Sequence, residues 1–143
     1  MDPSTMLGPI DLLAPVIEYI ILVLVVANMA TRHREHQQHL DQADNGVDEL
    51  TRYRPHVASN VALLLATFYF LTTDYHGGIV LGVLVIGMFI SDFFEFEARQ
   101  VELRNDRDLE TPKASIVASG VVFLYAFYLS VFFVVEPAWR LIF

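Results

Sequence analysis

The residues of this sequence best placed to bind a proton or a cation are carboxylates at the ends of long apolar runs. Asp92 and Glu95 close an apolar run that begins at Ile79, and Glu18 lies near the start of another, Ile10–Ala30. An ionisable group inside a bilayer costs free energy, so such residues usually mark ion or proton pathways. The sequence therefore gives Glu18, Asp92 and Glu95 as candidates for a proton or ion site.

Two of these carboxylates also have a structural interpretation. If the first helix begins near Pro15, Glu18 lies in its first turn, where the helix dipole and nearby water stabilise a negative charge. Asp92 lies at the same predicted depth as polar residues of the other runs. Together these residues can form an intramembrane polar cluster held by interhelical hydrogen bonds: Asn28, Asn60, Asp92, Ser115 and Ser119.

A charged stripe continues past the third apolar run. At about 100° per residue, Asp92, Glu95, Arg99 and Glu102 fall within about 80° of one helix face. Glu95 and Arg99 are four residues apart with the acid first, the orientation that stabilises a helix. The third helix is therefore expected to leave the membrane and continue as a cytoplasmic extension.

Three histidines, His33, His36 and His39, recur every third residue and are weak candidates for a metal site. Their spacing matches no closed set of ligands, and a solvated helix is the simpler interpretation. His56 and His76 are predicted at opposite membrane faces, which disfavours a haem held by two histidines. With no cysteine, no phosphate loop and no HExxH motif, nothing supports catalysis or a bound cofactor.

Four apolar runs of about membrane-spanning length must position these residues. The predicted spans are 10–31, 56–73, 78–104 including the cytoplasmic extension, and 112–136. The chain has 143 residues and is 55% hydrophobic, with the excess concentrated in these blocks. The prediction is a single domain, 1–143, with an all-α fold: an antiparallel, up-and-down four-helix transmembrane bundle in the cell membrane.

Basic residues flank the predicted spans unevenly. The segments 31–56 and 95–115 each carry four arginines or lysines, the segment 73–78 carries none, and the C-terminal segment carries Arg140 alone. Because basic residues favour the cytoplasmic side, both termini are predicted to lie outside. No basic residue precedes the first run, so no cleavable signal peptide is expected.

Glycines mark the expected turns and helix contacts. In TTDYHGG, Gly77 and Gly78 are free to adopt positive φ, which predicts a tight turn between the second and third spans. Gly78 and Gly82 also have the GxxxG spacing that allows close helix packing. The segment Ala43–Gly46 predicts a turn in the first cytoplasmic loop, with short helices at the membrane surface on either side.

The charge balance is unusual for a membrane protein. The net charge is −8, and Lys113 is the only lysine. Such a balance is typical of high-salt proteins, because at a Debye length of about 3 Å an acidic surface repels itself little. Ordinary acidic loops are the alternative. No nucleic-acid partner is expected for so acidic a chain.

Four stretches carry a resemblance to a known family: IEYIILVLVVANMATR from Ile17, YHGGIVL from Tyr75, DFFEFEAR from Asp92 and FFVVEPAW from Phe132. Over nearly its whole length the chain resembles an uncharacterised family of small integral-membrane proteins of halophilic archaea. The resemblance implies four spans and a membrane location, and it implies no activity.

Three functions from different classes follow as hypotheses. The first is a structural or accessory subunit of a membrane complex, with other membrane subunits or further copies of the chain as partners within the lipid bilayer. The second is a small proton- or cation-coupled transporter that uses Glu18, Asp92 or both. The third is a membrane enzyme or metal protein that uses Asp92, Glu95 and the histidines of 33–39.

Overall fold

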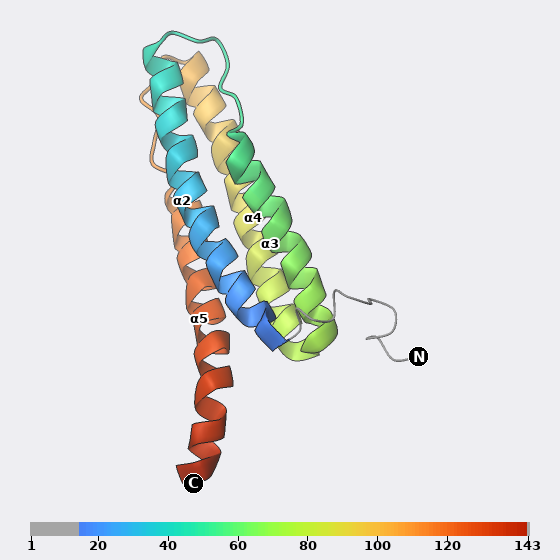
Figure 1. Ribbon diagram of the computed structural model, residues 1–143. Coiled ribbons are helices and arrows are strands. Elements are labelled where there is room, and N and C mark those ends of the chain that lie inside the picture. The colour runs from blue at the N-terminus through green and yellow to red at the C-terminus, as the bar shows by residue number, and fades with distance from the viewer. Residues whose placement is uncertain (1–14, 143) are drawn as a thin grey trace.

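Long helices make up nearly all of the structure. The computed structural model describes residues 15–142, with the backbone alone for 133–140 and 142. Its helices are α2 (Ile17–Asp44), α3 (Arg54–Thr73), α4 (Tyr75–Arg104) and α5 (Lys113–Ile142) (Figure 1). No strand occurs among these residues. The prediction of an all-α fold with four long helices is confirmed.

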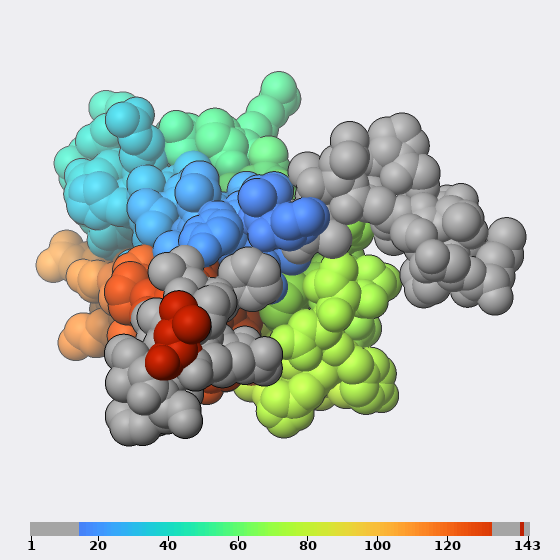
Figure 2. Space-filling model, turned by 60° about the horizontal axis from the view of Figure 1, so that its bottom comes forward, coloured from blue at the N-terminus to red at the C-terminus, as the bar shows by residue number. Residues whose placement is uncertain are grey.

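The helices form an elongated bundle in which each packs against two neighbours. α2 and α4 each contact both α3 and α5. Short connections join consecutive helices at alternating ends of the bundle, and α5 continues past the ends of the other helices (Figure 1). The start of α2 and the α3–α4 turn lie at the same end of the molecule as the end of α5 (Figure 2).

The apolar core follows one stripe of each helix. Its members recur every three or four residues, so they share a helix face. The core comprises Ile17, Ile21 and Val25; Leu63, Ala66 and Phe70; Leu81, Val85 and Met88; and Val122 and Ala126. The opposite faces are also apolar, with Val23, Leu65, Val83 and Leu124 each more than 60% exposed. A helix that is apolar on every side is typical of a membrane span.

Three of the described helices are long and apolar enough to cross a membrane: α3, α4, and α5 as far as Phe132. This part of the membrane prediction is confirmed. α2 differs because Glu18 lies in its first turn and charged residues follow from Arg32 onward. The predicted first span, 10–31, also begins in residues that lie outside the described part.

The connection between α2 and α3 is shorter than predicted. The segment expected to form a short separate helix is helical, but it continues α2 unbroken to Asp44. The prediction that the first helix ends near residue 31 is therefore wrong. No glycine or proline interrupts this stretch, which is rich in residues that favour helix. The predicted turn does follow it, and Gly46 has a φ of +73°.

The turn between α3 and α4 is also tighter than predicted. Asp74 alone separates the helices, and its Oδ1 accepts a hydrogen bond of 3.0 Å from the Gly77 N–H. Gly77 and Gly78 therefore lie in the first turn of α4, and the expectation of positive φ there is wrong. Gly78 instead permits close packing, since a Cβ there would lie 2.4 Å from the Leu71 Cα.

Candidate functional site

A stripe of polar residues along α2 faces the interior of the bundle. Asn28, Arg32, Glu35 and His39 are all buried. Their spacing of four, three and four residues places them on one face of a continuous helix. This stripe continues the core stripe of Ile17, Ile21 and Val25. The unbroken α2 thus carries an apolar contact surface in its first half and a charged one in its second.

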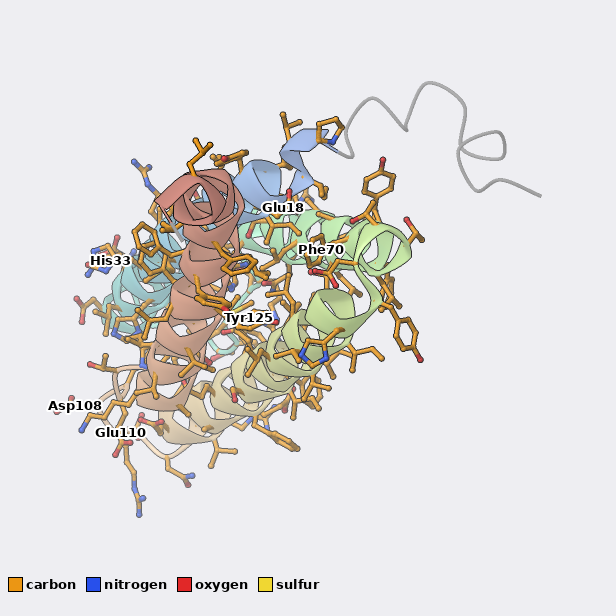
Figure 3. All side chains as sticks on the ribbon, turned by 90° about the horizontal axis from the view of Figure 1, so that it is seen from below. Glu18, His33, Phe70, Asp108, Glu110 and Tyr125 are labelled. Atoms are coloured by element: carbon orange, nitrogen blue, oxygen red, sulfur yellow. The ribbon has the colours of Figure 1, made fainter. Side chains whose placement is uncertain are left out.

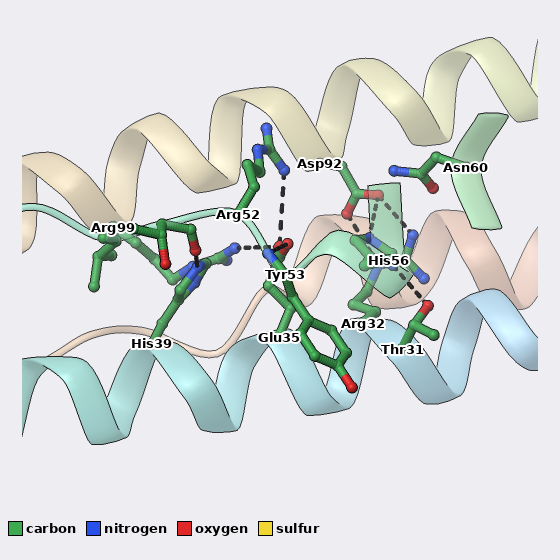
Figure 4. A network of polar contacts seen from close by, with 12 residues as sticks. Thr31, Arg32, Glu35, His39, Arg52, Tyr53, His56, Asn60, Asp92 and Arg99 are labelled. Carbon is green, nitrogen blue, oxygen red and sulfur yellow. Dashed lines mark hydrogen bonds and ion pairs between the residues drawn. The ribbon is translucent and has the colours of Figure 1, made fainter. Parts of the chain in front are cut away.

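Arg32 and Asp92 form the central ion pair of this interior. The Arg32 Nε donates to Asp92 Oδ1 at 3.0 Å, and the Arg32 Nη2 donates to Asp92 Oδ2 at 2.9 Å (Figure 4). Arg32 is 4% exposed and Asp92 is 7% exposed. A bidentate pair of this kind fixes both distance and orientation between α2 and α4.

His56 of α3 is a further hydrogen-bond partner of Asp92. Its Nε2 lies 3.1 Å from Asp92 Oδ2, and its Nδ1 lies 2.8 Å from the Thr31 hydroxyl oxygen. A carboxylate accepts, so the histidine Nε2 carries the proton in this arrangement. Both carboxylate oxygens of Asp92 are therefore occupied by cationic or N–H donors from α2 and α3.

Asparagine side chains extend the cluster toward the apolar core. Asn28 accepts from the Arg32 Nη2 at 2.9 Å and donates to Asn60 Oδ1 and to the Ser59 hydroxyl. Three of the five predicted cluster residues thus come together with two that were not predicted. We call this set the Asp92 cluster: Asn28, Arg32, His56, Asn60 and Asp92.

A second group of charges lies about two turns further along α2. Glu35 Oε1 lies 3.4 Å from the Arg99 Nη2 and 3.7 Å from the Arg52 Nη1, and its Oε2 accepts from the Tyr53 N–H at 3.1 Å. The Arg99 Nε donates to His39 Nδ1 at 3.0 Å (Figure 4). We call Glu35, His39, Arg52 and Arg99 the Glu35 cluster. Arg99 therefore pairs with Glu35 on α2, whereas the sequence suggested Glu95.

The connection between α2 and α3 is fastened to the end of α4. The Gln100 side chain accepts from the Leu50 N–H at 3.0 Å and donates to the Leu50 carbonyl at 2.9 Å. The Arg52 guanidinium lies 4.1 Å from the centre of the Phe96 ring, within cation–π range. These contacts hold the connection over the Glu35 cluster.

His39 is fixed as a neutral imidazole by its two neighbours. Its Nδ1 accepts from Arg99, so its Nε2 carries the proton and donates to the Thr51 carbonyl at 2.8 Å. Burial lowers the pKa of His39; the hydrogen bond to Thr51 opposes this effect, and the charge of Arg99 adds to it. Protonation would place a second N–H against the Arg99 donor.

We predict that the protein loses stability as the pH falls below about 6.5, the pKa of histidine in an unfolded chain. Above that pH the imidazole is neutral in both states. Below it the unfolded chain binds the proton first, because the folded pKa is lower, and the equilibrium shifts toward unfolding. Thermal melts from pH 7.5 to 5.5 should show a smaller loss for His39→Gln than for the unaltered protein. The exposed His33→Gln is the control, and an equal pH response in all three proteins would contradict this role.

Glu95 is a residue of α4, and its side chain lies beside the start of α5. Its Oε1 accepts from the backbone N–H groups of Ala114 and Ser115, at 2.8 and 3.2 Å. The first N–H groups of a helix have no partner within the helix, and a carboxylate there also matches the helix dipole. Glu95 thus joins the second half of α4 to the first turn of α5.

The remaining predicted site residues do not belong to the Asp92 cluster. Ser119 donates to the Ile116 carbonyl and lines a cavity beside Arg32. Ser115 is fully buried, and its hydroxyl has no partner among the described residues. Glu18 lies near the opposite end of the bundle, between the helices (Figure 3), and its Oε2 is buried with no partner in the described part of the chain.

The three histidines of α2 occupy different surroundings. His33 is exposed, His36 is partly buried and His39 belongs to the Glu35 cluster. Within residues 15–142, no three histidine, aspartate or glutamate side chains lie close enough together to hold a metal ion. Burial, followed by the charge of Arg99, lowers the pKa of His36.

Arg32 and His56 are the important residues that the sequence interpretation missed. Arg32 was counted as a topology signal and His56 as an interface residue. One signal is present in the sequence: Asp92 lies too far inside the third apolar run to remain unpaired, and Arg32 is the first cation at its level on another helix.

A bundle of long helices with apolar outer faces and a buried network of ion pairs is typical of a polytopic membrane protein. The chain belongs to the DUF7313 family, a domain of unknown function, which matches residues 2–143. The searches of curated proteins and of solved structures each found no match.

Proposed function

We propose that this protein is a multi-pass protein of the cell membrane that serves as a structural or accessory subunit of a membrane complex. The observation that carries the proposal is the pairing of its interior charges. Both oxygens of Asp92 and both oxygens of Glu35 are engaged by groups of other elements. Such an interior supports a fixed arrangement of helices, and it leaves the wide apolar outer surface for contacts with lipid and with other subunits.

We further infer an antiparallel four-span topology with both termini outside. In this arrangement the first half of α2 forms the span that complements α3, α4 and α5. The connections around 45–53 and 105–112 then lie in the cytoplasm, where the basic residues favour them. The Asp92 and Glu35 clusters lie toward that side. The acidic, lysine-poor composition supports a high-salt setting for this membrane.

The absence of cysteine makes this topology directly testable. We expect Asp48→Cys and Asp108→Cys to be protected from a membrane-impermeant maleimide in intact cells and labelled after lysis. His76→Cys should be labelled in intact cells. All three positions are exposed, so each variant offers a reachable thiol. Labelling of Asp48→Cys in intact cells would overturn the orientation.

The accessory role is tested by the native mass of the protein. We expect tagged full-length chain, extracted in mild detergent and high salt, to carry defined other subunits in fixed ratio. An unrelated four-span protein with the same tag is the control for proteins that co-purify non-specifically. A homo-oligomer alone would overturn the role.

A homo-oligomer would favour the second candidate, a proton- or cation-coupled transporter. The buried Oε2 of Glu18, which has no partner among residues 15–142, is the observation that keeps this candidate. Flux in proteoliposomes that is lost in Glu18→Gln, and retained in the exposed control Glu97→Gln, would then establish transport.

A further inference from the structure

A cavity of about 150 Å³ lies between α2 and α5, close to the Asp92 cluster. We call it the α2–α5 cavity. Its wall combines the apolar side chains of Met29, Pro112 and Ile116 with the polar side chains of Arg32, His36 and Ser119. The cavity could hold several water molecules or a compact polar group beside an apolar chain.

Two buried polar atoms of the cavity wall have no partner among the described residues: the Arg32 Nη1 and the His36 Nδ1. The Arg32 guanidinium uses its Nε and Nη2 for Asp92 and Asn28. Because the guanidinium is planar and its donors have fixed directions, Nη1 lies on the side away from the carboxylate. Two N–H groups of a side chain that is 4% exposed are thus left without an acceptor. Buried donors of this kind call for an acceptor that the described residues do not supply.

A neighbouring cavity shows why an oxyanion fits here. On the other side of Thr111 and Pro112 a cavity of about 140 Å³ is lined by Arg99, whose Nη1 is likewise unpaired. That cavity is also lined by Glu95, Glu102 and Glu110, whose charges repel an anion. No carboxylate lines the α2–α5 cavity. Its donors are therefore available to an oxygen that carries negative charge.

The apolar part of the wall identifies the source of that anion. Arg32 lies at the end of the predicted first span, and α5 begins at Lys113, so the cavity lies at headgroup depth in the topology proposed above. The outward faces beside it, at Val26 and Val117, are apolar and exposed. We propose that the α2–α5 cavity binds the phosphate headgroup of an anionic phospholipid, with an Arg32 N–H and His36 as donors and the acyl chains along α2 and α5.

The test is lipid binding to the delipidated full-length protein, measured by native mass spectrometry. The probes are dioleoyl phosphatidylglycerol, dioleoyl phosphatidylcholine and millimolar inorganic phosphate. We expect one phosphatidylglycerol to bind about tenfold more tightly than phosphatidylcholine. Both lipids carry the phosphate, but the choline cation is repelled by Arg32 and meets no carboxylate among the lining residues. Phosphate alone should not displace it.

Two variants locate the site. His36→Glu places a carboxylate beside the free Arg32 donor and should weaken phosphatidylglycerol binding several-fold. Gln37→Glu adds the same charge at the next, exposed position and should leave binding unchanged. If His36→Glu does not fold, Ile116→Trp, which fills the cavity from α5, replaces it.

Three results would overturn the proposal: equal binding of the two lipids, equal weakening by His36→Glu and Gln37→Glu, or no lipid bound in stoichiometric amount. Displacement by inorganic phosphate would also overturn it and identify a free anion as the ligand. The proposal rests on the topology, but the two fail separately, because cysteine labelling reports orientation without reference to lipid.

Discussion

Arg32→Met is expected to lower the free energy of unfolding by about 3–5 kcal/mol, the usual cost of removing one partner from a buried ion pair. The variant keeps the length of the side chain but leaves Asp92 buried with His56 as its remaining donor. It also removes the donor to Asn28. The loss should be measured by unfolding in mixed micelles of mild detergent and dodecyl sulfate, followed by circular dichroism.

The exposed Arg34→Met is the matched control for this change, and it should alter stability by no more than about 0.5 kcal/mol. The double variant Arg32→Met with Asp92→Leu should recover much of the loss, because no uncompensated charge then remains. If the losses of the two single variants simply add, the pair does not act as a unit.

Gly78→Ala is expected to destabilise the hairpin of α3 and α4 by about 1–3 kcal/mol, the range for overpacking in a close contact. The added Cβ would lie 2.4 Å from the Leu71 Cα and 2.9 Å from the Leu71 backbone nitrogen. Backbone atoms cannot rotate away as a side chain can, so the two helices must separate at the turn. The same unfolding assay measures the loss.

Gly82→Ala is the control, since it lies one turn further along the same helix. Its Cβ would meet only the Thr67 Cγ2, at 3.9 Å, an ordinary contact. Both variants gain the same helix propensity from alanine, so the difference between them isolates the clash at residue 78. Equal stability of the two variants would show that the α3–α4 contact is looser than described.

The helices themselves could be predicted because apolar runs and their interruptions are local properties of the sequence. The two places where the prediction failed were decided by contacts that are not local. The polar half of α2 could be predicted as a solvated helix, but it has no apolar periodicity to show that one of its faces is buried. That face becomes visible only when Asp92 and Arg99 are placed opposite it. At Gly77 and Gly78 the composition indicated a turn, but the chain needed their small size for close packing.

The polar cluster was predicted in part for the same reason. Asn28, Asn60 and Asp92 could be grouped because each lies at a similar distance from the end of an apolar run. Arg32 and His56 were assigned elsewhere, because a basic residue near a span end serves equally well as a topology signal. Whether Arg32 or Arg34 turns inward depends on the rotation of α2, and single-sequence patterns do not fix this rotation.

The ion pairs of the interior have a consequence for biogenesis. Arg32 and Asp92 are 60 residues apart in the chain, and Glu35 and Arg99 are 64 apart. At about 5–20 residues per second, a ribosome needs about 3–12 s to make the intervening segment. Throughout that interval the nascent α2 carries charges whose partners on α4 have not yet been made. The charged interior can therefore close only after α4 has left the ribosome, and in the membrane location proposed above Arg32 must remain without Asp92 until then.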